Sequence, residues 1–303
     1  MKSSSYWLLA ITILVCTSIA APSRGDADRP QALRIDYQKI RDELRDSIHG
    51  IPVYTRSEEH KDLINAEVYG VLGYPLEKLA KILATPANWC EFATLHPNVK
   101  ACTYAQRHGQ ALLTLHLDRK TRASIEHAFV IKLRYRIGHL DEDYFTALLE
   151  GDKGPLGTRN HRFQLEAVAV EDKTFVRVSF SYRWRLIGRM ATTVYLAMRG
   201  HDTVGFSTVG VDDKGYPIYV KGKKAMMERN VMRCYFALRA FMDTQHLTAS
   251  ERFEARISYW FDLAEKYFPK PYDMEREEYV EVKRQERRNR VELSSERRVA
   301  QPM

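Results

Sequence analysis

Residues 63–104 constrain the fold more than any other part of this 303-residue chain. From Ile64 to Val68, apolar side chains alternate with polar ones, which is the period-2 pattern of a strand. Gly73 ends this strand, and two short helical segments follow. The second segment has Pro86 at its first position, where a missing N–H group costs nothing. A further strand begins near residue 99, so the expected order is strand, helix, helix, strand.

Several later segments alternate in the same way, and tight turns join them. They are residues 111–117, 127–137, 144–150, 161–170 and 174–186. Together with residues 63–71 and 99–104, they predict seven strands of an antiparallel meander. A long helix is expected at residues 221–245, because its apolar side chains recur along one broad stripe. Residues 203–220 are expected to form a hairpin, serving either as a lid or as extra strands.

This order of elements resembles the START-like superfamily, also called SRPBCC, over residues 63–245. The resemblance implies an α+β helix-grip fold. In that fold, a curved antiparallel sheet of about seven strands wraps around a long C-terminal helix. It also implies an apolar cavity between the sheet and the helix. Residues 246–271 are expected to add a packed helix, with a capping box between Thr248 and Glu251.

The cavity implied by this resemblance would be lined by the inner faces of the strands and the long helix. The candidates are Leu133, Tyr135, His161, Phe163, Leu165, Phe180, Tyr182, Trp184, Met227, Asn230, Met232, Tyr235 and Phe241. Methionine and aromatic side chains make an adaptable lining for large apolar ligands. His161, Tyr182 and Asn230 are the candidates for orienting a ligand. Aromatic residues at alternating positions are equally typical of a solid core, and that alternative stays open.

The two ends of the chain lie outside this domain. Residues 1–20 resemble a cleavable secretory signal, with Lys2, a short apolar run and a small-x-small pattern ending at Ala20. This predicts a periplasmic or secreted protein. Residues 21–62 are expected to be a peripheral arm with a short helix at residues 37–49. Residues 272–303 hold eight basic and eight acidic side chains, and are expected to be a lone helix or disordered.

Three cysteines remain once the signal is removed. An oxidising compartment permits disulfides. In the fold that the resemblance implies, Cys90 and Cys102 lie on neighbouring elements, which favours a bridge between them over two buried thiols. Cys234 falls on the apolar face of the long helix and is expected to be a free thiol.

Sequence motifs of catalysis are mostly absent, and no catalytic residue, metal or cofactor is assigned. The expected function is to bind a lipid or other apolar molecule, and a role as its periplasmic carrier is a further expectation. The alternatives are an enzyme similar to polyketide cyclases and aromatases, and an interaction module without a ligand. The formal charge is +8, or +7 without Lys2 (8 − 1). This basic excess is typical of a soluble surface, and it also permits peripheral contact with an anionic membrane. Nucleic acid is not expected as a partner in that compartment.

Overall fold

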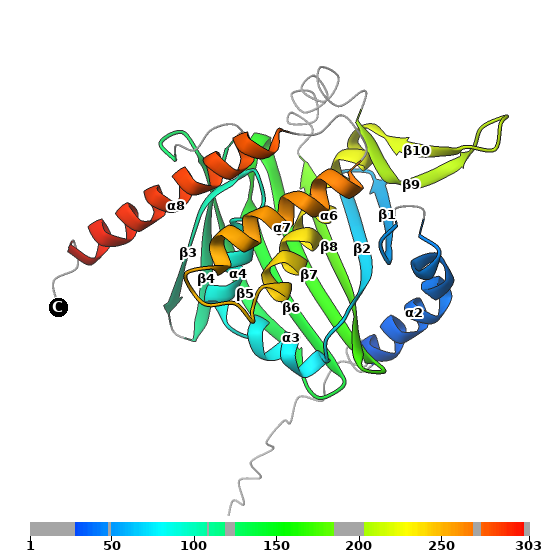
Figure 1. Ribbon diagram of the computed structural model, residues 1–303, viewed down its shortest axis with the longest axis horizontal. Helices are drawn as coiled ribbons and strands as arrows, with labels where there is room; N and C mark the ends of the chain where they lie inside the picture. The colour runs from blue at the N-terminus through cyan, green and yellow to red at the C-terminus, as the bar shows by residue number, and fades with distance from the viewer. Residues whose placement is uncertain are drawn as a thin grey trace, which may run out of the picture.

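The computed structural model describes residues 28–47, 50–107, 109–118, 125–184, 203–268 and 274–299. Its centre is one antiparallel sheet with the strand order β1-β2-β8-β7-β6-β5-β4-β3 (Figure 1). The strands are β1 (Val53–His60), β2 (Leu63–Leu72), β3 (Val99–Arg107), β4 (Gln110–Leu117), β5 (Phe129–Leu140), β6 (Tyr144–Lys153), β7 (Thr158–Val170) and β8 (Lys173–Trp184). All seven expected strands are present, and β1 is the eighth.

Strand β1 lies in the segment that was expected to be a peripheral arm. It pairs with β2 along its whole length, from Val53 opposite Gly70 to His60 opposite Leu63. The expected arm therefore supplies an edge strand of the main sheet. The helix α2 (Arg29–Arg45) precedes it, and begins earlier than the expected helix at residues 37–49.

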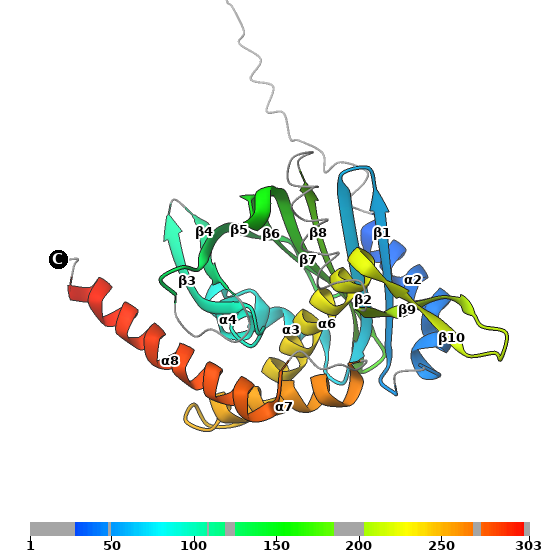
Figure 2. The same cartoon turned by 90° about the horizontal axis from the view of Figure 1, so that it is seen from above.

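The helices cover the sheet unequally. Helices α3 (Leu76–Leu83), α4 (Pro86–Ala93) and α6 (Gly222–Asp243) share one hydrophobic core with the inner face of the sheet. Helix α7 (Arg252–Tyr267) packs against α6 on the side away from the strands (Figure 2). Helix α2 packs on the opposite, outer face, where Leu33 and Leu44 contact a second cluster that includes Phe175.

The long helix α6 is held by the sheet, as the sequence predicts. Its contacts with the main sheet are with β2, β8 and β1, and fourteen of its side chains are buried. One of them, Glu228, is fully buried although it is acidic. Its carboxylate accepts hydrogen bonds from the backbone N–H groups of Phe206 at 2.7 Å and Ser207 at 2.9 Å, and from the Ser57 hydroxyl at 2.6 Å.

These hydrogen bonds fasten a hairpin to α6. The hairpin consists of β9 (Val204–Val211) and β10 (Pro217–Lys221), a two-stranded sheet separate from the main one. Figures 1 and 2 show its tip projecting beyond the body of the molecule. The hairpin expected at residues 203–220 is thus present. The segment just before it, residues 185–202, lies outside the described residues.

The charged C-terminal segment forms α8 (Arg276–Val299), and the beginning of this helix is docked on the domain. The Lys283 and Lys100 ammonium groups donate to the two oxygens of Glu286, at 2.8 and 2.9 Å, and all three side chains are at most 4% exposed. The Tyr279 ring stacks on Trp260 at a centroid distance of 4.7 Å. Of the two expected states of this segment, the structure shows the helix.

A disulfide joins Cys90 on α4 to Cys102 on β3, with their α-carbons 5.1 Å apart, and Cys234 is free. Both observations agree with the sequence analysis. Within the described part of the chain, no helix combines the length and the apolar character needed to cross a membrane.

Candidate functional site

Aromatic side chains on the inner face of β7 and β8 keep part of their surface accessible. Phe163, Phe180 and Tyr182 pack against the main core but are only half-buried. The rings of Phe180 and Tyr182 lie 5.8 Å apart, and Tyr182 meets Trp184 edge-on at 5.7 Å. We call the three half-buried residues Phe163, Phe180 and Tyr182 the aromatic surface. The tilted rings of this surface leave apolar area accessible next to a closed core.

His161 stands beside this surface because of a β-bulge in β7. Arg159 pairs with Arg183 and Arg162 pairs with Ser181, so Asn160 and His161 both lie opposite Tyr182 alone. Asn160 has a φ of +52°, in the left-handed region. A bulge of this kind re-aims a side chain relative to the regular strand. It places the His161 ring 5.2 Å from Tyr182, nearly parallel to it, and 5.9 Å from Phe180.

Two neighbours fix the imidazole in this position. Its Nε2 lies 2.9 Å from the Thr158 hydroxyl. A β-carbon on Gly154 would overlap the ring, so only glycine allows the ring to lie there. His161 is 6% exposed, and burial lowers its pKa to about 4. The side chain is therefore neutral at ordinary pH.

A buried indole and an ion pair lie at the end of the aromatic surface. Trp184 is 2% exposed, and its Nε1 has no hydrogen-bond partner among the described residues. The Lys223 ammonium of α6 lies 4.6 Å from the centre of the Trp184 ring and 3.2 Å from a Glu59 oxygen of β1. Burial, followed by the charge of Glu59, raises the pKa of the Tyr182 hydroxyl to about 12.

The other predicted lining residues belong to a closely packed interior. Those that are buried in the main core are Leu133, Tyr135, Leu165, Met227, Met232, Tyr235 and Phe241. The Tyr135 hydroxyl donates to the Leu83 carbonyl at 2.7 Å. Asn230 is half-buried, and its amide oxygen lies 3.0 Å from Nε2 of His96, away from His161. Of the three candidates for orienting a ligand, the structure brings together His161 and Tyr182. The cavity itself stays a prediction.

The sequence analysis did not identify Gly154 and Thr158, the residues that fix His161. Gly154 lies in the turn between β6 and β7, where glycine is an ordinary residue, and Thr158 is the first residue of β7. Lys223, at the start of α6, was also missed. No local pattern marks any of the three. Gly154 and Thr158 matter because the bulge places His161 next to them, and Lys223 matters through its contacts with Trp184 and Glu59.

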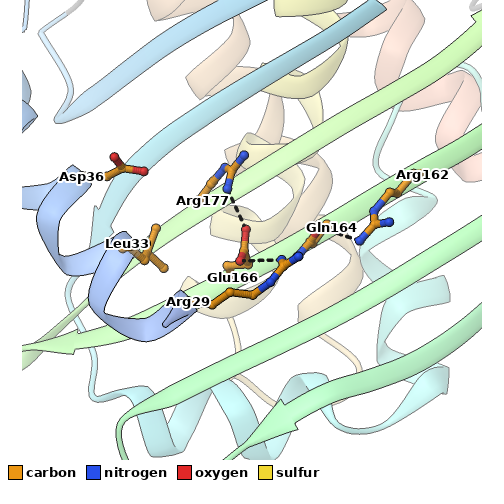
Figure 3. A pocket seen from close by; sticks show the side chains of 8 residues that line it. Arg29, Leu33, Asp36, Arg162, Gln164, Glu166 and Arg177 are labelled. Atoms are coloured by element: carbon orange, nitrogen blue, oxygen red, sulfur yellow. Dashed lines mark hydrogen bonds and ion pairs between the residues drawn. The ribbon is translucent and has the colours of Figure 1, made fainter. Parts of the chain in front are cut away.

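A pocket of about 400 Å³ lies on the opposite face of the sheet, between α2 and strands β7 and β8 (Figure 3). Charged side chains line it and bind one another. Glu166 accepts from Arg177 at 3.0 Å, from Arg29 at 3.5 Å and from the Tyr144 hydroxyl at 2.8 Å. Arg162 donates to Gln164 at 3.2 Å. These contacts attach α2 to the sheet, and we place the candidate functional site on the inner face.

The arrangement of sheet and helices defines the class of fold. An eight-stranded antiparallel sheet with two short helices between β2 and β3 holds one long helix, which is the α+β helix-grip architecture. No protein-family model matches the sequence, and no curated protein matches it.

Solved structures with a similar arrangement include three from different organisms. An aromatase/cyclase from a Streptomyces species has a TM-score of 0.36 and 14% identity, covering 62% of this chain and 98% of that one. Norcoclaurine synthase from Thalictrum flavum has a TM-score of 0.30 and 11% identity, covering 47% and 77%. A protein from Thermus thermophilus has a TM-score of 0.37 and 10% identity, covering 60% and 99%. The fold class itself rests on the sheet and helices described above.

Proposed function

We propose that this chain is a START-like protein that binds an apolar molecule between its sheet and α6. The observation that carries the proposal is the aromatic surface. Phe163, Phe180 and Tyr182 keep accessible area on the face that otherwise packs against the core. Covering such area with an apolar ligand is favourable by about 25 cal/mol per Å². A lipid or another apolar molecule is the expected class of ligand.

We also propose that the chain acts outside the cytoplasm. The Cys90–Cys102 disulfide supports this location, because disulfides persist in oxidising compartments. The signal peptide expected at residues 1–20 lies outside the described residues. An exported protein of this kind would carry its ligand between membranes or hold it in the periplasm.

The partner we propose for ligand exchange is an anionic membrane. The projecting hairpin supports this, because Val209, Val211 and Tyr216 are each about two-thirds exposed, and Ile218 is 42% exposed. Lys214 at the tip of the hairpin and Lys221 at the end of β10 are both exposed. Apolar side chains next to basic ones suit the interface of an anionic bilayer.

Titration with the uncharged fluorescent probe N-phenyl-1-naphthylamine tests the binding proposal. The full chain should bind the probe with a rise in fluorescence, and Phe180→Asn should weaken that binding at least tenfold. Ser181→Asn is the matched control, because Ser181 is the next residue and its side chain points to the outer face. Absence of probe binding by the unaltered chain would count against the proposal.

The enzyme alternative has one observation in its favour. The neutral imidazole of His161, which is stacked on the Tyr182 ring, can take part in acid–base chemistry. This would suit an activity similar to that of the polyketide cyclases and aromatases. Conversion of a bound molecule that is lost in His161→Phe, while binding is retained, would favour the enzyme over the carrier.

The third reading is an interaction module without a ligand. The close packing of Met232 and Tyr235, both 0% exposed, favours a filled interior. An unaltered chain that binds no apolar probe but retains a protein partner through α7 and α8 would favour this reading.

A further inference from the structure

The ring nitrogen of His161 that carries the hydrogen decides whether the other nitrogen can accept a hydrogen bond from a ligand. The Thr158 hydroxyl carries a single hydrogen, which it donates to the Pro155 carbonyl at 2.6 Å. Its other contact is Nε2 of His161 at 2.9 Å. Because the hydroxyl hydrogen is already used, the hydroxyl oxygen accepts, and Nε2 must be the donor. The neutral imidazole therefore carries its hydrogen on Nε2.

The second ring nitrogen of His161 is then a bare acceptor. In this tautomer Nδ1 has a lone pair and no hydrogen. No hydrogen bond joins Nδ1 to any of the residues that the structure describes. Burial of the ring disfavours the imidazolium form, so Nδ1 stays unprotonated in the pH range where the protein would work.

The groups around His161 further limit the class of ligand that fits the site. Phe180 and Tyr182 supply apolar faces at 5.9 and 5.2 Å. The Tyr182 hydroxyl makes no hydrogen bond within the described part of the chain and is a further donor. Glu59 and Lys223, at the end of the aromatic surface, pair with each other. Nδ1 of His161 offers only a lone pair, so it cannot bind the oxygen of an ether or a ketone. It also disfavours a carboxylate ligand, because the positive charge of Lys223 is already paired with Glu59.

We propose that the site selects an apolar molecule that carries a hydroxyl group. The ligand O–H donates to Nδ1 of His161, and its apolar part covers Phe180 and Tyr182. This inference rests on the proposed function, since it names the class of ligand for the same site. His161 is here a specificity-determining residue.

A pair of probes that differ only in the hydroxyl hydrogen tests the inference. 2-Naphthol has an O–H group, and 2-methoxynaphthalene replaces it with a methyl ether. The full chain should bind 2-naphthol about threefold to tenfold more tightly, as expected for one added net hydrogen bond. In His161→Phe this preference should disappear, while the binding of 2-methoxynaphthalene stays the same. His139→Phe is the matched control, because His139 is exposed and bonded to Asp141.

The outcomes separate the two proposals. Equal binding of both probes by the unaltered chain would overturn the hydroxyl selectivity and leave the apolar-binding function standing. Binding of neither probe would overturn both. A His161→Phe chain that binds 2-methoxynaphthalene normally but still prefers 2-naphthol would assign the selectivity to another residue and overturn the role of His161.

Nuclear magnetic resonance of the unaltered chain tests the tautomer without a substitution. Long-range ¹H–¹⁵N correlation of the His161 ring should show a protonated Nε2 and a bare Nδ1 from pH 7 down to pH 5. Addition of 2-naphthol should shift the Nδ1 resonance, and 2-methoxynaphthalene should not. A ring with its hydrogen on Nδ1 would contradict the inference, whatever the behaviour of the variant.

Discussion

The phenol ring of Tyr235 on α6 lies so close to Gly70 on β2 that no side chain fits between them. Tyr235 is fully buried, and Gly70 lies in the middle of the β2–β8 pairing, opposite Val176. The missing side chain at residue 70 therefore sets how closely the gripped helix approaches the sheet.

Gly70→Ala should lower the free energy of unfolding by about 1–3 kcal/mol, because a β-carbon would push Tyr235 and α6 away from β2. Urea denaturation measures the change. Gly73→Ala is the matched control, since a β-carbon there meets no atom within 4 Å. Equal stability of the two variants would contradict the close contact.

Acid should destabilise the protein through Glu67 on the outer face of the sheet. Burial opposes ionisation of this carboxyl, but Arg177 outweighs that effect and lowers its pKa from 4.5 to about 2. The ionised form is stabilised in the folded state, so this contribution is complete above pH 4.5 and is lost as the pH falls towards 2.

Glu67→Gln should cost about 3 kcal/mol at pH 7, because Arg177 and Arg56 both lose the buried carboxylate that they share, and Arg177 keeps only Glu166. The loss should shrink between pH 4.5 and pH 3. Asp152→Asn, which breaks an ion pair with Arg134 that is exposed on both sides, should cost at most about 1 kcal/mol. Unfolding at several pH values compares the two, and a loss of stability in Glu67→Gln that does not vary with pH would argue against this account.

His161 should make a separate contribution at higher pH. Its pKa falls from 6.5 in the unfolded chain to about 4 in the folded one. Between these values the unfolded chain binds the additional proton, so stability decreases as the pH is lowered from 6.5 to 4. Between pH 7 and pH 4.5, the free energy of unfolding of His161→Phe should therefore fall by about 2 kcal/mol less than that of the unaltered chain. Parallel losses in the two proteins would refute the burial of a neutral imidazole.

Helix α8 should depend on its buried ion cluster. Glu286→Ala leaves the Lys100 and Lys283 ammonium groups without their carboxylate and should cost about 3 kcal/mol. Glu281→Ala removes an exposed pair with Arg288 on the same helix and should cost at most about 1 kcal/mol. Limited proteolysis within residues 276–299 should increase only in Glu286→Ala. Similar behaviour of the two variants would mean that α8 is not anchored there.

Strand alternation made most of this fold predictable, and the exceptions have physical causes. β1 was missed because only Val53 and Thr55 are buried in it, so the alternation ends after three residues. The docking of α8 was missed because Lys283 and Glu286 are charged. Composition assigns such residues to solvent, whereas here Glu286 is paired in the interior with both Lys283 and Lys100 of β3.

The candidate site was predictable only in part. The alternation along β8 correctly places Phe180, Tyr182 and Trp184 on one face. The position of His161 depends on the left-handed backbone conformation of Asn160. Such a conformation is usually predicted from a glycine, and residue 160 is not one. The tautomer depends on Thr158, the first residue of β7, which no local sequence pattern marks.

Organic extraction followed by mass spectrometry of the full-length, exported protein tests the central claim most directly. The account predicts about one apolar molecule per chain, carrying a hydroxyl group, and its loss in Phe180→Asn but not in Ser181→Asn. An empty extract from the unaltered chain, together with no binding of N-phenyl-1-naphthylamine, would contradict it.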